Sequence, residues 1–224
     1  FVAGAFAKRK TKSWNKQRLY ALLDAAAPSV GTVIQEVVPV FAAPGITTTM
    51  TIANSVSSSI GARSARFKGN VAVYDAAGHL AGTQSFAVPQ GDRADITVSD
   101  MLAGAPAEND YLIGSCWVER MPQGSGYRGS IRGHFTVRTP RGTTALHAQE
   151  PQKPGTRTFM TTRLNAEEDQ FLSLVNCADR SSCVKVRISL LHGDDDGQEL
   201  SADIVAYGCV LLPLPRLGVG SKEH

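Results

Sequence analysis

The sequence predicts a mainly β protein: two tandem antiparallel β-sandwich-like modules with a short N-terminal helix. One observation behind this is an internal repeat, in which a strand, an Asn-led loop, an alternating strand, a Gly turn and a second alternating strand occur twice in the same order. The first copy opens at Ile52-Ala53-Asn54 and the second at Leu174-Val175-Asn176. A second observation is that the apolar segments are short, rich in β-branched residues and separated by Gly and Pro.

Composition limits the protein class. The chain has 224 residues, of which 42% are hydrophobic and 19% charged, values typical of a folded protein. The formal net charge of +3 is too small to require an anionic partner, so the sequence does not favour nucleic acid binding. The basic residues gather in an N-terminal arm: Lys8, Arg9, Lys10, Lys12, Lys16 and Arg18. No apolar run reaches the roughly 18 residues that a transmembrane helix needs.

The elements follow in order along the chain. Residues 1–32 form the basic arm and the short helix, which Ser13 caps. Residues 33–140 form the first β-sandwich module, which begins with a strand that Pro39 restricts to a sheet edge or a connector. Residues 141–155, rich in Pro and Gly, form a linker, and residues 156–224 form a second, shorter β module.

The second module is predicted to be incomplete. The first module is expected to end with a hairpin of two strands over 111–120 and 130–138, and the second has no counterpart of it. An unfinished sheet leaves an edge that proteins normally cover. The sequence therefore predicts a homo-oligomer or a protein partner, unless another segment of the chain supplies the missing strands.

The loop Ser55–Gly69 is the main difference between the two copies. Loops of this length often bind a ligand or make an assembly contact, although a solvated hairpin extension also fits the pattern. Its basic residues and two aromatic residues of the same module are the candidate partner-binding residues: Arg63, Arg66, Lys68, Trp117 and Tyr127.

Four cysteines leave the compartment open. Cys177 and Cys183 flank a connection between two strands, where strand ends facing each other can approach closely enough for a disulfide. Two reduced thiols are the alternative, which favours a cytoplasmic location slightly over a periplasmic or cell-surface one. Cys116 and Cys209 lie within apolar strands, where a thiol behaves as a small core hydrophobe.

Motifs for catalysis, cofactors or metals are weak. The glycines of 124–129 have the spacing of a dinucleotide fingerprint, but the residues after them alternate as a strand, so we expect a hairpin turn and no cofactor. The acidic segment 192–199 lacks the full calcium-loop spacing and is predicted to be a turn or, alternatively, a weak cation site. The five histidines occur singly and no nucleophile elbow is present, so no catalytic or metal-binding residue is predicted.

Several short motifs carry a family resemblance: the segments 71–78, 88–91, 100–102 and 117–119. Over roughly residues 46–138 they resemble the sensory rhodopsin transducer family and related small bacterial β-sandwiches, with a partial second copy near 170–217. The resemblance implies a non-catalytic, oligomerising module that binds a partner or a ligand. We therefore expect a non-enzymatic interaction or assembly module. The alternatives are a glycan-binding or cell-surface module and a hydrolase whose triad is not visible in the sequence.

Overall fold

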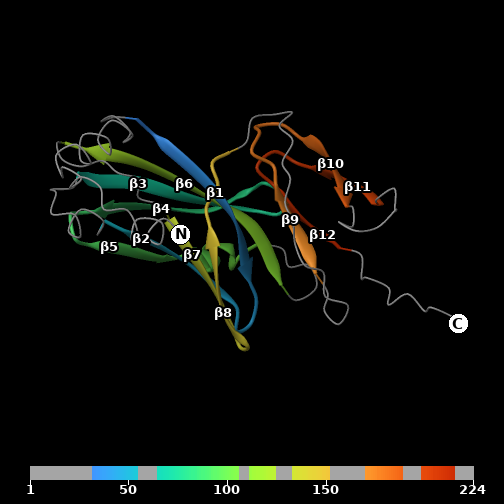
Figure 1. Cartoon of the computed structure of the whole chain (residues 1–224), viewed down its shortest axis with the longest axis horizontal. Helices are drawn as coiled ribbons and strands as arrows, with labels where there is room; N and C mark the ends of the chain where they lie inside the picture. Colours follow the sequence, from blue (N-terminus) through green and yellow to red (C-terminus); the bar gives the residue numbers. More distant parts are fainter. Residues whose placement is uncertain are drawn as a thin grey trace, which may run out of the picture.

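The computed structural model describes residues 32–54, 65–105, 111–124, 133–151, 170–188 and 198–214. The protein is mainly β, as the sequence predicts (Figure 1). The strands of its first part are β1 (Ile34–Ala42), β2 (Thr47–Ala53), β3 (Arg66–Asp75), β4 (Leu80–Val88), β5 (Arg93–Thr97), β6 (Leu112–Gln123), β7 (Gly133–Thr139) and β8 (Gly142–His147). The strands of its second part are β9 (Phe171–Val175), β10 (Ser182–Ile188), β11 (Gln198–Ile204) and β12 (Cys209–Pro213).

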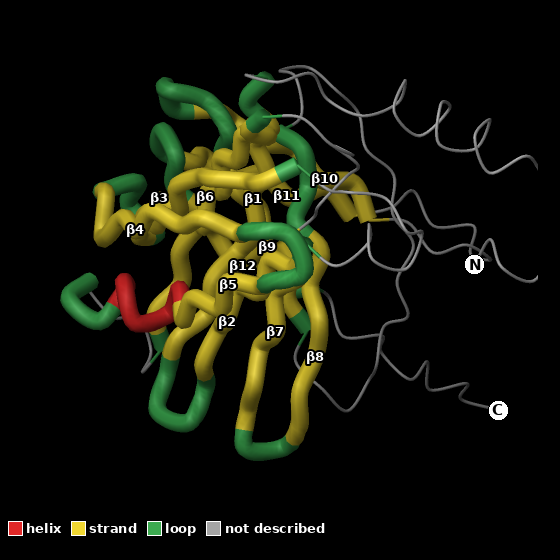
Figure 2. Tube along the Cα trace, turned by 90° about the vertical axis from the view of Figure 1, so that its left-hand side faces the viewer, coloured by secondary structure: helices red, strands yellow, loops and turns green. Residues whose placement is uncertain are grey.

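The first module is a sandwich of two antiparallel four-stranded sheets, which Figure 2 shows as two layers. One sheet has the order β1-β6-β3-β4 and the other β5-β2-β7-β8. The strands alternate in burial, so one face of each sheet points inward and fills the core. The largest apolar side chains of that core are fully buried: Phe67, Phe135, Met50, Ile52 and Leu102.

β1 is an edge strand, as Pro39 predicts. Its free side is covered at one point, because the backbone of Val37 exchanges two hydrogen bonds with Gln149, at 2.8 and 2.9 Å. Proline has no N–H to donate, so its place on this side of the sheet costs no ladder hydrogen bond.

Two sequence predictions about the end of this module are wrong. β6 and β7 do not form a hairpin: β6 pairs with β1 and β3 in one sheet, whereas β7 pairs with β2 and β8 in the other. Residues 142–147, which were assigned to the linker, form the edge strand β8. β6 and β7 therefore belong to different layers. The hairpin with a tight turn lies one strand later, between β7 and β8.

The two layers are also joined by a buried ion pair. Arg120 of β6 and Glu36 of β1 are 2% and 3% exposed, and their Nη2 and Oε1 atoms are 2.6 Å apart. The backbone N–H of Gly133, on β7 in the opposite sheet, donates to the second oxygen of Glu36 at 3.5 Å. The carboxylate thus contacts both sheets from within the core, where a charge is stable only if it is paired.

The internal repeat is present in the structure and centres on two buried asparagines. The side-chain amide of Asn54 donates to the backbone oxygens of Ala65 and Val88, at 2.9 and 3.2 Å. The amide of Asn176 donates in the same way to Arg180, Ile204 and Val205, at 2.8, 3.0 and 2.9 Å. Each asparagine therefore ties the end of its strand to the connection that follows and to the end of the returning hairpin.

The strands around each asparagine also correspond. β2 pairs with β5 as β9 pairs with β12, and the hairpin β3–β4 matches the hairpin β10–β11. The backbone N–H of Asn54 donates to Asp92 at 2.8 Å, and that of Asn176 donates to Gly208 at 2.9 Å. These matched bonds define a first repeat unit (β2–β5) and a second repeat unit (β9–β12).

The first repeat unit is completed by four further strands, whereas no strand of the described ranges completes the second. In the first unit, β6 pairs with the outer side of β3 and β7 pairs with the outer side of β2. The corresponding sides of β10 and β9 pair with no strand of the described ranges, where each sheet of the second unit has two strands. The start of the predicted second module, residues 156–169, lies outside the described residues, as do residues 1–31 of the predicted arm and helix.

Candidate functional site

The two repeat units meet through a cluster of three aromatic rings. Tyr207, in the turn before β12, stacks on Tyr74 with ring centroids 5.1 Å apart and packs edge-on against Trp117 at 5.6 Å. Tyr74 and Trp117 also pack edge-on, at 6.5 Å. Each such pair contributes about 0.5–1.5 kcal/mol beyond the apolar area it buries, so the cluster is a substantial contact between the units.

Hydrogen bonds fix the position of this cluster. The hydroxyl of Ser115 on β6 donates to the backbone oxygen of Tyr207 at 3.0 Å and accepts from the indole Nε1 of Trp117 at 3.1 Å. The N–H of Cys209 donates to the oxygen of Ala76 in the β3–β4 turn at 3.3 Å. We call the contact formed by Tyr74, Ala76, Ser115, Trp117 and Tyr207 the inter-unit joint.

Tyr207 is unusual because its backbone is left-handed, with φ of 57°. The matched hydrogen bonds place Tyr207 at the position that Gly91 occupies in the first unit, where φ is 78°. An alignment of glycine with glycine would instead pair Gly91 with Gly208, one position later. A left-handed conformation costs a non-glycine residue about 1–2 kcal/mol, which the stacking of the tyrosine ring offsets.

Replacing Gly78 with alanine should loosen the joint. A Cβ at this position would overlap the backbone oxygen of Ala206, and its φ of +78° already disfavours any side chain. Gly91→Ala is a matched control, because Gly91 has the same φ of +78° and nothing within 4 Å of the added atom. We expect Gly91→Ala to lose about 1 kcal/mol in urea unfolding from backbone strain, and Gly78→Ala to lose more because the backbone of Ala206 must also move. Only Gly78→Ala should also shift the fluorescence of Trp117, measured in a Trp14→Phe background; equal spectra for the two variants would contradict the joint.

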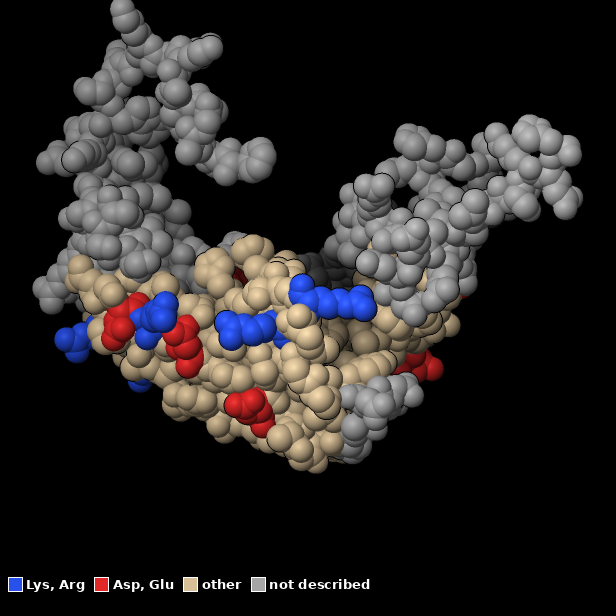
Figure 3. Space-filling model, turned by 90° about the horizontal axis from the view of Figure 1, so that it is seen from below, with Lys and Arg blue, Asp and Glu red and all other residues tan. Residues whose placement is uncertain are grey.

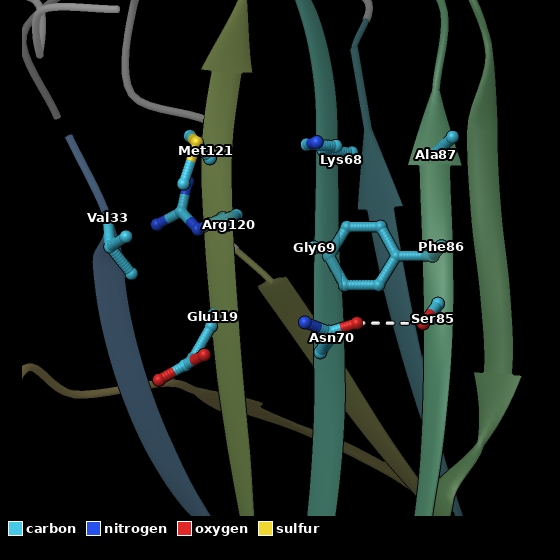
Figure 4. Close-up of a pocket in the computed structure, with 10 residues that line it drawn as sticks. All are labelled: Val33, Lys68, Gly69, Asn70, Ser85, Phe86, Ala87, Glu119, Arg120 and Met121. Carbon is cyan, nitrogen blue, oxygen red and sulfur yellow. Dashed lines mark hydrogen bonds between the residues drawn. The ribbon is translucent and has the colours of Figure 1, made fainter. Parts of the chain in front are cut away.

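A shallow groove lies on the outward face of the sheet β1-β6-β3-β4, with a volume of about 560 Å³. Figure 4 shows its lining, in which side chains of β3, β4 and β6 lie side by side. Two polar pairs belong to this region: Ser85 donates to Asn70 at 2.8 Å, and Gln35 donates to Glu119 at 2.7 Å. The remaining lining residues are Val33, Lys68, Gly69, Phe86, Ala87, Arg120 and Met121.

The structure separates the candidate partner-binding residues. Lys68 is exposed and lines the groove, and Arg66 is exposed at the start of β3. Trp117 is half-buried in the inter-unit joint, so it is engaged within the chain. Arg63 and Tyr127 lie outside the described residues, as does the acidic segment up to residue 197.

No family model, curated protein or solved structure matches the chain. The expected kinship with the sensory rhodopsin transducer family therefore stays a prediction.

On the face shown in Figure 3, basic and acidic side chains are interspersed, so this face presents no strip of one sign. Within the described ranges, no three His, Cys, Asp or Glu side chains gather in a way that could hold a metal ion. No helix in the described part of the chain is long and apolar enough to cross a membrane.

The four cysteines are free thiols in this structure, which corresponds to the reduced alternative for Cys177 and Cys183 and not to the disulfide. The sulfur of Cys177 lies 3.9 Å from the backbone oxygen of Val175, in the Asn176 loop. Cys183 is exposed on β10, and a hydrogen bond with the side chain of Asp203 raises the pKa of its thiol. The two sulfurs therefore face different neighbours.

Thiol labelling should distinguish the four cysteines. Burial raises the pKa of Cys116 far above its usual range, and burial followed by the charge of Asp75 raises the pKa of Cys209 to about 12. We expect Cys177 and Cys183 to react with a disulfide reagent in the native protein at pH 8, and all four to react after denaturation. A disulfide-linked peptide that joins Cys177 to Cys183 in unreduced protein would contradict this expectation and support the disulfide alternative.

Proposed function

We propose that this protein is a non-enzymatic assembly module, and that its second repeat unit binds another copy of the chain by strand addition. The observation that supports this most strongly is the incomplete second unit. Where β6 and β7 complete the first unit, the equivalent sides of β10 and β9 have no partner strand in the described ranges. A strand side that pairs with no strand of the described ranges is a template onto which a further strand can add.

The side chains of β10 fit this role. On one face, Val184, Val186 and Ile188 are half-buried, whereas in the equivalent strand β3 Val71 and Val73 are fully buried. The other face is polar and exposed: Cys183, Lys185 and Arg187. A strand added beside β10 would bury the apolar face further, as β6 does for β3, and each buried side chain contributes about 1.5–3 kcal/mol when fully removed from water.

Glycan binding is the second candidate, because the groove beside Lys68 and Asn70 mixes polar and apolar groups. Glycan sites usually offer an aromatic ring for stacking. Trp117, Tyr127 and Tyr74 are the aromatic candidates for this role; Tyr127 lies outside the described residues, and Tyr74 and Trp117 are turned toward Tyr207. The groove therefore gives weaker support than the unpaired strands.

Light scattering coupled to size exclusion tests the proposal. We expect the chain to elute as a dimer or larger assembly at about 10 µM. Val186→Lys should shift the mass toward the monomer, because a charge on the half-buried face of β10 opposes the burial that strand addition requires. Lys185→Thr, on the opposite face of the same strand, should leave the mass unchanged. A strictly monomeric wild-type chain would overturn the proposal.

A further inference from the structure

Two histidines lie side by side on the outward face of the second sheet of the sandwich. His134 on β7 and His147 on the edge strand β8 are directly paired across the strands. Both side chains are exposed, and their ring centroids are 5.5 Å apart with an angle of 71° between the planes. The two histidines are thirteen positions apart in the chain, so the sequence alone gives no reason to pair them.

The spacing of the two rings matches that of two imidazoles on one metal ion. A zinc ion lies about 2.0–2.1 Å from each ligating nitrogen, and hence about 3.2 Å from each ring centroid. At a tetrahedral angle, the two centroids are then about 5.2 Å apart. The observed 5.5 Å is within 0.3 Å of this value, so the two exposed rings have the spacing that one shared ion requires.

The geometry points to a surface site for a divalent transition metal of the zinc class, held by His134 and His147, with water in the other positions. Neutral imidazole is a common ligand for such ions. In the same row of the sheet, Thr51 is paired with His134 on one side and with Asp95 on the other, and its hydroxyl donates to Asp95 at 2.6 Å. The metal would connect the edge strand β8 to β7.

Zinc titration of the untagged full chain tests this site. We expect one saturable zinc-binding event by calorimetry in a non-chelating buffer. His134→Ala and His147→Ala should each weaken it at least tenfold, because one remaining imidazole cannot chelate; even changes to outer-shell partners cost about 10–100-fold in metal affinity. Both positions are exposed, so far-UV circular dichroism should show that the variants remain folded.

His79→Ala is the matched control. His79 is exposed in the β3–β4 turn and lies 3.3 Å from Asp75, so it is a surface histidine with an acidic neighbour and, among the described residues, no imidazole paired with it. We expect its zinc affinity to equal that of wild type. Zinc should raise the melting temperature of wild type and of His79→Ala, but not of the double variant His134→Ala/His147→Ala. Equal affinity in that double variant, or no saturable binding by wild type, would overturn the assignment.

Discussion

Replacing Arg120 with alanine is expected to destabilise the protein by about 3–5 kcal/mol, the range seen when one partner of a buried ion pair is removed. Glu36 would keep its carboxylate in the core, 3% exposed, after losing the guanidinium that lies 2.6 Å away. Since Glu36 also accepts from Gly133, both sheets should be affected. Equilibrium unfolding in urea, followed by circular dichroism, measures the loss.

Two further variants separate the ion pair from a general effect of removing arginine. Arg138→Ala, at an exposed position on the outer face of β7, should change stability by no more than about 0.5 kcal/mol. The double variant Glu36→Leu/Arg120→Met removes both charges and should recover much of the lost stability. A loss below about 1 kcal/mol for Arg120→Ala would mean that the core does not enclose this pair as described.

Replacing either repeat asparagine with aspartate should have the second large effect, about 3 kcal/mol or more. The amide of Asn176 donates to three backbone oxygens and that of Asn54 to two, whereas an ionised carboxylate of the same shape can donate to none. Each oxygen left without a donor costs about 1–3 kcal/mol, and the buried charge adds to the penalty. Parallel losses for Asn54→Asp and Asn176→Asp would establish that the two units use the same device.

The pH dependence gives these aspartate variants a signature of their own. The buried carboxyl would have a folded pKa above its unfolded value of about 3.9. Its penalty should therefore be complete above the folded pKa and should fade as the pH drops toward the unfolded value. Asn176→Ala, which removes the same donors but adds no titrating group, should lose about 3 kcal/mol or more at every pH. Identical pH profiles for alanine and aspartate would contradict the buried position of the amide.

The asparagines also show how much the sequence could predict. Alternation and turn residues were sufficient for the fold class, and the repeat beginning at Asn54 and Asn176 corresponds to matched hydrogen bonds. The hairpin of β6 and β7 was wrong because alternation describes which face of a strand is buried and not which strand lies beside it. Arg120 alternates with Cys116 and Val118 on the inward face of β6, and this alternation could have predicted that Arg120 is buried. Because a buried arginine requires a buried acid, it could also have predicted an ion pair.

The sites were less predictable because they depend on contacts between distant segments. Trp117 was identified from its residue type, but its position in the inter-unit joint depends on Tyr207, ninety residues later. The sequence did not identify Tyr207, because a left-handed position is usually occupied by glycine. A tyrosine at the position equivalent to Gly91 is therefore not expected from the sequence. The pairing of His134 with His147 follows from the tight turn between β7 and β8, which the sequence analysis had placed in a linker.

Hydrogen exchange at β10 and β9 tests the central proposal, that another chain covers the open edges of the second repeat unit. Amides bound to a partner strand exchange slowly, and a partner that binds by mass action should slow them further as the protein concentration rises. Mass spectrometry of peptides covering 171–175 and 182–188 should show this increase in protection between about 1 and 100 µM. Protection within β3 and β6 should stay constant over the same range. Equal exchange of the β9 and β10 peptides at all concentrations, in a chain that remains monomeric, would contradict the account.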